Sequence, residues 1–155
     1  ISVIEHIPAP YDVTAVQEAW RTLKEHGTFL VTLPVMACGC DETRAEDVYR
    51  LAGQHARVGE RHFFQRWYDE GSLYERFTSH LPGARILGKE IYGEKKNGWF
   101  IEYQRRWGNQ GAAVSCSDPL YMLTQFRRYG RIDELPGAGI LCMGIVKDNG
   151  ALDHN

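Results

Sequence analysis

Two apolar runs near the start of the chain constrain its fold more than any other feature. Residues 1–7 (ISVIEHI) are mostly β-branched and stop at Pro8, and residues 28–33 (TFLVTL) are apolar almost throughout and stop at Pro34. Runs of this length and composition predict short buried strands. Because both runs are apolar on both faces, they predict neighbouring parallel strands in a sheet that helices cover on its two sides.

The segment between the two runs predicts an amphipathic helix over residues 14–26. Apolar side chains recur on one face at helical spacing, and they are Val13, Val16, Ala19, Trp20 and Leu23. Thr14 with Gln17 fits a capping box, and Gly27 suits the end of the helix. Strand, helix and strand then form a βαβ unit, whose crossover should be right-handed.

The remaining residues predict a mixture of helices and strands within a single domain over residues 1–155. Pattern and turn residues predict helices over 43–55, 70–77 and 119–129, and strands over 84–94 and 139–146. Residues 98–107 are aromatic-rich and favour neither type. The polar tail, residues 147–155, is expected to fray.

Composition and charge exclude several classes of protein. A net charge of −2 gives no electrostatic footprint for nucleic acid, and no apolar run approaches the ~20 residues that span a bilayer. The four cysteines are too few and too irregularly spaced for a disulfide framework, so we expect reduced thiols and, by default, a cytoplasmic setting. Because His26, His55 and His62 share no metal-ligand spacing, we expect no metal site.

Four segments in order resemble the second half of the class I S-adenosylmethionine-dependent methyltransferase domain. They are a strand ending in Glu5-His6-Ile7, a helix ending in residues 18–27 (EAWRTLKEHG), a strand ending at Pro34, and the run at 65–73 (QRWYDEGSL). Within the second segment, proline and glycine are usual in the family where this chain has Glu-His. The resemblance covers about residues 1–95, and the strand over 139–146 fits the reversed strand that closes such sheets.

The resemblance implies an α/β fold: a partial Rossmann-like methyltransferase sheet, strands four to seven of seven, with flanking helices. Members of the family bind the cofactor with a glycine-rich turn after the first strand and an acidic residue after the second strand. This chain shows no such turn, since Gly137-Ala-Gly139 precedes a strand instead of following one. We therefore expect that half to lie upstream of Ile1, and S-adenosylmethionine to bind only together with it.

The expected function is that of the C-terminal portion of a methyltransferase acting on a small molecule or a glycan precursor. The alternative is a non-catalytic remnant of the fold that works as a binding or interaction module. A small α/β hydrolase is disfavoured, because the sequence has no Gly-x-Ser-x-Gly elbow.

Ligands of open parallel sheets bind outside the carboxyl ends of the strands, where Glu5-His6 and Leu33-Pro34 would lie. The resemblance implies cofactor contacts from Ser2, Val3, Ile4, Glu5 and His6. His6 is also the candidate catalytic base, because an imidazole titrates near neutral pH. The candidate substrate contacts are Tyr11, Leu33, Pro34, Arg61, His62, Trp67 and Tyr68.

These residues could instead have purely structural roles. Residues 2–4 suit the core of a strand, and the aromatic residues between 63 and 68 suit packing. If residues 1–7 form a strand without an upstream neighbour, its apolar edge lacks the lysines and prolines that protect edges. We then expect self-association through that strand.

Overall fold

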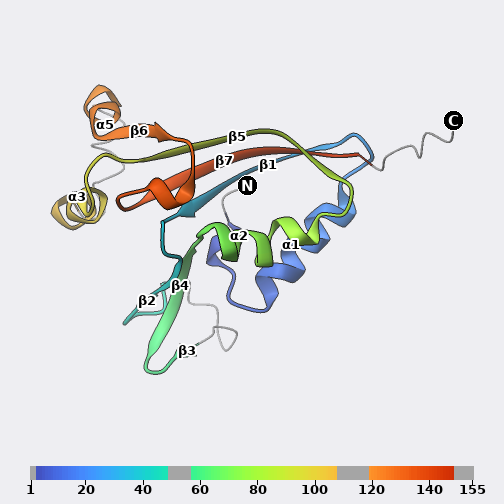
Figure 1. Ribbon diagram of the computed structural model, residues 1–155. Helices are drawn as coiled ribbons and strands as arrows, with labels where there is room; N and C mark the ends of the chain where they lie inside the picture. The colour runs from blue at the N-terminus through green and yellow to red at the C-terminus, as the bar shows by residue number, and fades with distance from the viewer. Residues whose placement is uncertain (1–2, 49–56, 108–118, 149–155) are drawn as a thin grey trace, which may run out of the picture.

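The structure, a computed structural model, describes residues 3–48, 57–107 and 119–148 (Figure 1). Within these ranges, seven strands form two sheets. The larger sheet has the order β1-β7-β5-β6 and comprises β1 (Thr28–Val35), β5 (Ala84–Glu94), β6 (Phe126–Tyr129) and β7 (Gly139–Lys147). The smaller sheet has the order β2-β4-β3 and comprises β2 (Cys40–Arg44), β3 (Arg57–Val58) and β4 (Arg61–Trp67). Every pairing within both sheets is antiparallel.

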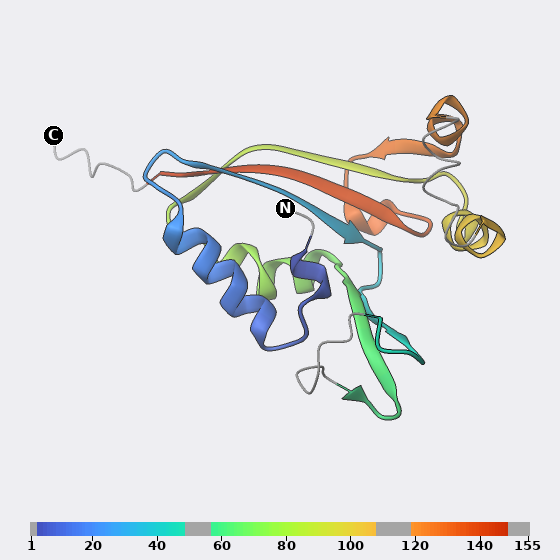
Figure 2. The same ribbon diagram turned by 180° about the vertical axis from the view of Figure 1, so that it is seen from behind.

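Helices cover one face and one end of the larger sheet. Figures 1 and 2 show α1 (Tyr11–Thr22) and α2 (Glu70–Arg76) beneath one face. The helix α3 (Trp99–Trp107) follows β5, and α5 (Pro119–Gln125) leads directly into β6. Three 3-10 turns complete the elements of the described residues: η1 (Ile4–His6), η2 (Thr78–His80) and η4 (Ile132–Glu134). Of the described helices, none is long and apolar enough to cross a membrane.

The core lies between the larger sheet and α1 and α2. Along β1, residues alternate between the core and the opposite face: Phe29 and Val31 are buried, whereas Leu30 is 66% exposed. Val16 and Trp20 of α1 pack into the same core, as the periodicity of that helix predicts. The face of the sheet away from these helices is thus open along β1, and the prediction of a sheet covered on both sides is wrong.

The predicted parallel pair is also wrong, and the expected Rossmann-like sheet, which is parallel, is not supported because every described pairing of the larger sheet is antiparallel. Ile4–His6 form a 3-10 turn, in which His6 N–H donates to Val3 O at 2.9 Å, and β1 pairs with β7 instead. A strand requires a partner, whereas this turn is held by a hydrogen bond between the ring of His6 and Phe64 O of β4. Self-association through residues 1–7 stays a prediction, without the strand on which it was based.

Most of the later elements match their predictions. The helix α2 and the strands β5 and β7 are confirmed, and residues 99–107 form a helix. The predicted helix over 43–55 is wrong at its start, because Cys40–Arg44 pair with β4; residues 49–56 lie outside the described residues. The predicted helix over 119–129 ends at Gln125, because residues 126–129 pair with β5. The first helix starts at Tyr11 and ends at Thr22, so Thr14 does not cap it.

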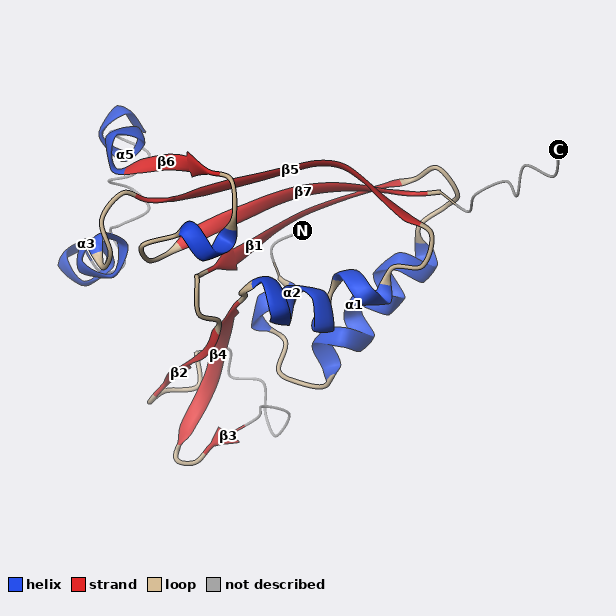
Figure 3. Cartoon of the chain, in the orientation of Figure 1, coloured by secondary structure: helices blue, strands red, loops and turns tan. Residues whose placement is uncertain are grey.

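The two sheets meet at the end of β1, from which the smaller sheet projects (Figure 3). Tyr68 N–H donates to Pro34 O at 2.9 Å, and Met36 N–H donates to Tyr68 O at 3.0 Å. Val35 and Tyr68, both buried, form an isolated parallel bridge at this joint. The joint therefore fixes the end of β4 beside the end of β1.

Buried charges tie α1 to β4 and α2. The carboxylate of Asp12 is fully buried; it accepts two hydrogen bonds of 2.6 Å from Arg76 and another from Arg66 Nη1. Arg66 also donates from Nε to Asp41 at 2.8 Å. Burial by itself raises the pKa of Asp12, but the hydrogen bond from Arg76 and the charges of both arginines outweigh it and lower that pKa.

Candidate functional site

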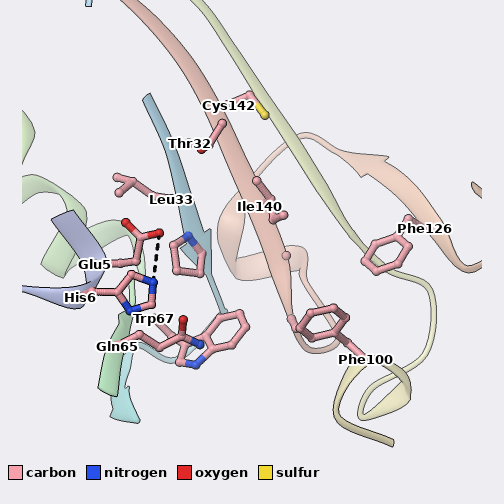
Figure 4. A pocket seen from close by; sticks show the side chains of 13 residues that line it. Glu5, His6, Thr32, Leu33, Gln65, Trp67, Phe100, Phe126, Ile140 and Cys142 are labelled. Atoms are coloured by element: carbon pink, nitrogen blue, oxygen red, sulfur yellow. Dashed lines mark ion pairs between the residues drawn. The ribbon is translucent and has the colours of Figure 1, made fainter. Parts of the chain in front are cut away.

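A cavity of about 550 Å³ lies at the joint of the two sheets (Figure 4). The antiparallel register sets Thr32 beside Cys142 and Pro34 beside Ile140, and these four side chains form its floor. Thr32 and Pro34 face the cavity because they alternate with the buried residues of β1. In Figure 4, Glu5, His6 and Gln65 lie on one side of the cavity, and Phe100 and Phe126 lie on the other.

The polar wall is built around His6. Its Nδ1 lies 2.9 Å from the carbonyl oxygen of Phe64. Because a carbonyl only accepts, Nδ1 carries the proton, and in the neutral ring Nε2 is the acceptor. Nε2 lies 3.8 Å from Oε1 of Glu5, whose side chain is 4% exposed (dashed line in Figure 4). The arrangement is a histidine of fixed tautomer with a carboxylate beside its second nitrogen.

Glu42 of β2 positions two further lining residues. Its Oε2 accepts from Gln65 Nε2 at 2.7 Å and from the indole N–H of Trp67 at 3.2 Å. Because a carboxylate only accepts, these bonds orient the amide of Gln65 and leave its Oε1 as the acceptor. The ring of Trp67 is held beside the amide, so its apolar surface lines the cavity.

The apolar wall is held in place by Glu94, which is 1% exposed at the end of β5. Its carboxylate accepts backbone hydrogen bonds from Gly98, Phe100 and Ala138, at 2.9, 2.8 and 2.9 Å. Gly137 passes so close that a Cβ there would lie 1.8 Å from Glu94 Oε1. One buried side chain thus fixes the start of α3, which carries Phe100, against the start of β7.

The structure brings together five of the predicted site residues and separates the others. The cavity is lined by Glu5, His6, Leu33, Pro34 and Trp67. Six further predicted residues, all of them described, do not line it: Val3 and Tyr11 are 57% and 62% exposed, Ile4 lies in the core, and Arg61 donates to Thr43. His62 is half-buried on β4, and Tyr68 is in the core, where burial raises its pKa to about 12. Ser2 lies outside the described residues.

Several lining residues were missed by sequence reasoning. Thr32 left a signal, since it and Thr28 are the only polar residues of the second apolar run. Gln65 belongs to the run that carries the resemblance, but nothing in the sequence pairs it with Glu42. Phe100 and Phe126 come from α3 and β6, and no local pattern places those elements at this cavity.

Among the side chains described, no group of three or more His, Cys, Asp or Glu residues is placed to hold a metal ion. Comparisons with protein-family models, curated proteins and solved structures found no match. The methyltransferase resemblance therefore rests on the sequence segments alone.

Proposed function

We propose that this chain is the C-terminal portion of an S-adenosylmethionine-dependent methyltransferase that acts on a small molecule or a glycan precursor. In this proposal the cavity binds the methyl acceptor. One observation carries it: Glu5-His6 and Leu33-Pro34, which the resemblance places at the site of transfer, line a single cavity together with Trp67.

One feature of the strand order agrees with the proposal, although every described pairing in the larger sheet is antiparallel and a Rossmann-like sheet is parallel. The strand β7 is antiparallel to both β1 and β5 and lies between them, so β1 and β5 run in the same direction on either side of a reversed strand. The resembled sheet is likewise closed by a reversed strand. The proposed assignment of β1, β5 and β7 to the last strands of a Rossmann-like sheet does not require the residues 1–7 to form a strand here.

The cofactor would supply an activated methyl group for an in-line displacement, a reaction in which positioning contributes much of the rate. Glu5 and Gln65 line the cavity with hydrogen-bond acceptors, which fit the positively charged, methyl-donating end of the cofactor. The sequence offers no glycine-rich turn after a strand for the nucleoside. The residues of this chain therefore fit the methyl-donating end of the cofactor and not its nucleoside.

His6 is the general base of the proposed mechanism. Its Nε2 takes the proton that the nucleophilic atom of the acceptor loses, while Nδ1–H continues to donate to Phe64 O. The ring then carries a positive charge beside the carboxylate of Glu5, which stabilises that charge.

The test is methyl transfer by the protein expressed from its natural gene, with labelled S-adenosylmethionine and panels of amines, alcohols and glycan precursors. We expect His6→Asn to lower kcat about 10²–10⁴-fold and to abolish the rise of the rate with pH. His26→Asn is the control, because His26 is exposed and its φ of 58° suits asparagine.

Two outcomes would contradict the proposal. An unchanged pH profile in His6→Asn would remove His6 as the base. Absence of transfer to every acceptor, with ligand binding in the cavity retained, would favour the non-catalytic binding module.

A further inference from the structure

We propose that the ligand of the cavity carries an unbranched hydrocarbon chain, and that a trough on the open face of the larger sheet binds that chain. The inference rests on the proposed function for the polar head of the ligand lying in the cavity, and on the shape and chemistry of the trough for the chain. Under the proposed function, the head is the group that receives the methyl.

The trough is a second hollow, of about 370 Å³, lined by residues of β1, β5 and β7. It shares Thr32 and Cys142 with the cavity, so the cavity leads directly into it. The strand β7 runs from Ile140 in the cavity to Gly144 in the trough, which is roughly 13 Å at the rise of a strand. The two hollows together therefore suit an extended ligand with its two ends in different surroundings.

Two glycines form the floor of the trough. Gly88 of β5 lies opposite Gly144 of β7 in the antiparallel register. A Cβ built at Gly88 would meet nothing within 4 Å, and one at Gly144 would lie 3.4 Å from Leu30 Cδ2 and 3.8 Å from Leu87 Cβ. The two leucines, 66% and 53% exposed, thus flank a gap about as wide as one side chain. A single hydrocarbon chain fits this gap, whereas a helix, about 10 Å across, is too wide to enter it.

The lining of the trough favours an apolar occupant. Among its described residues Glu90 alone carries a charge, and Arg128 pairs with both of its carboxylate oxygens, at 2.8 and 2.5 Å. The flanking leucines are large apolar side chains exposed on the same face. A hydrocarbon chain between them removes apolar surface of both partners from water, which stabilises the complex in proportion to the area buried.

A series of hexyl, octyl and decyl β-D-glucosides tests the inference, because the neutral head is constant and only the chain lengthens. Each is titrated into the 155-residue chain below its micelle concentration, and the NMR shifts of the backbone amides locate it. We expect the affinity to rise about twofold to fourfold for each added methylene. The shifts at Gly88 and Gly144 should grow with the length of the chain.

Gly88→Gln fills the trough with a polar side chain. The space at Gly88 is open and its backbone is not left-handed, so the variant should keep the fold. In this variant the rise of affinity with chain length should be lost. Gly71→Gln, at the exposed start of α2, is the matched control and should retain the full rise.

Affinity independent of chain length, an undiminished rise in Gly88→Gln, or shifts confined to another surface would each overturn the inference. So would a second copy on this face, seen in light scattering as a dimer that Gly88→Gln dissociates. If Gly88→Gln fails to fold, the location of the shifts on the unaltered chain still decides.

The titration contains no cofactor, so its result is separate from the proposed function. Binding in the trough that strengthens with chain length, without methyl transfer, would leave this inference standing and contradict the proposed function. Methyl transfer to acceptors without any dependence on chain length would do the reverse.

Discussion

Glu94 shows how one side chain can fix a wall of the cavity. It is buried, and both carboxylate oxygens accept backbone hydrogen bonds from two separate segments of chain. Glutamine has the same shape but replaces one acceptor oxygen with an N–H₂ donor, which would face a backbone N–H. A buried donor left without an acceptor destabilises a protein by about 1–3 kcal/mol.

We therefore expect Glu94→Gln to lower the free energy of unfolding by about 1–3 kcal/mol in urea titrations. Glu102→Gln, on the exposed face of α3, is the control and should change it by less than about 0.5 kcal/mol. Equal stability of the two variants would mean that the carboxylate does not hold these segments together.

At the scale of elements, Asp69 starts α2 and connects it to the loop before β2. Its Oδ1 accepts from Ser72 N–H at 2.7 Å in a capping box, and its Oδ2 accepts from Gly39 N–H at 3.0 Å. These hydrogen bonds, first among them the one from Ser72, lower the pKa of Asp69. We expect Asp69→Ala to destabilise the fold by about 1–2 kcal/mol, measured by thermal unfolding.

Ser72→Ala is the informative comparison for that variant. It removes the reciprocal bond to the Asp69 backbone but retains the carboxylate and its bond to Gly39. Its effect should be smaller than that of Asp69→Ala. Equal effects in the two variants would show that the link to Gly39 contributes nothing to stability.

Sequence patterns predicted the elements that form because of their own local sequence. The strand β7 was predicted from an apolar run, and the helix α2 from the pattern of residues 70–77. The strand β2 did not, because Cys40–Arg44 is polar and exists through its pairing with β4. Residues 1–7 misled in the opposite way: their composition favours a strand, but η1 packs against β4 and is held by His6.

The residues of the candidate site divide in the same way: those with a local sequence pattern were predicted, and those brought in by distant elements were not. Segments at strand ends predicted Glu5, His6 and Pro34, and the aromatic run before the late helix predicted Trp67; the structure places all four in one cavity. Phe100 and Phe126 could not be predicted, because Glu94 and the pairing of β5 with β6 bring them there from distant positions. Tyr68 was predicted beside Trp67, but successive residues of a strand point to opposite faces, and Tyr68 is buried in the core.

At the scale of the whole molecule, the buried charges at Asp12 make stability depend on acid. The folded pKa of Asp12 is lowered from 3.8, so the folded state binds fewer protons than the unfolded state in the acid range. Ionised Asp12 stabilises the fold fully at pH values above its pKa in the unfolded state. This stabilisation is lost as the pH falls through the pKa of Asp12 in the folded state. The melting temperature should therefore rise with pH between about pH 3 and about pH 5.

Asp12→Asn should flatten this rise and destabilise the protein at neutral pH by about 3–5 kcal/mol, because Arg66 stays buried with less opposing charge. Asp133→Asn, at an exposed ion pair with Arg131, is the control and should keep the acid dependence. Melting curves followed by circular dichroism across this range measure both effects. An unaltered slope in Asp12→Asn would assign the acid sensitivity to other carboxylates.

The cavity draws its walls from both sheets, and this has a mechanical consequence. Its floor belongs to β1 and β7, whereas Gln65 and Trp67 belong to β4, and the sheets meet at Val35 and Tyr68. A ligand that contacts both walls acts as a strut across this joint and resists bending between the sheets. The free energy of ligand binding then depends on the stiffness of the joint, and the stiffness of the joint depends on whether the ligand is bound. A molecule that touches a single wall leaves the joint as compliant as before.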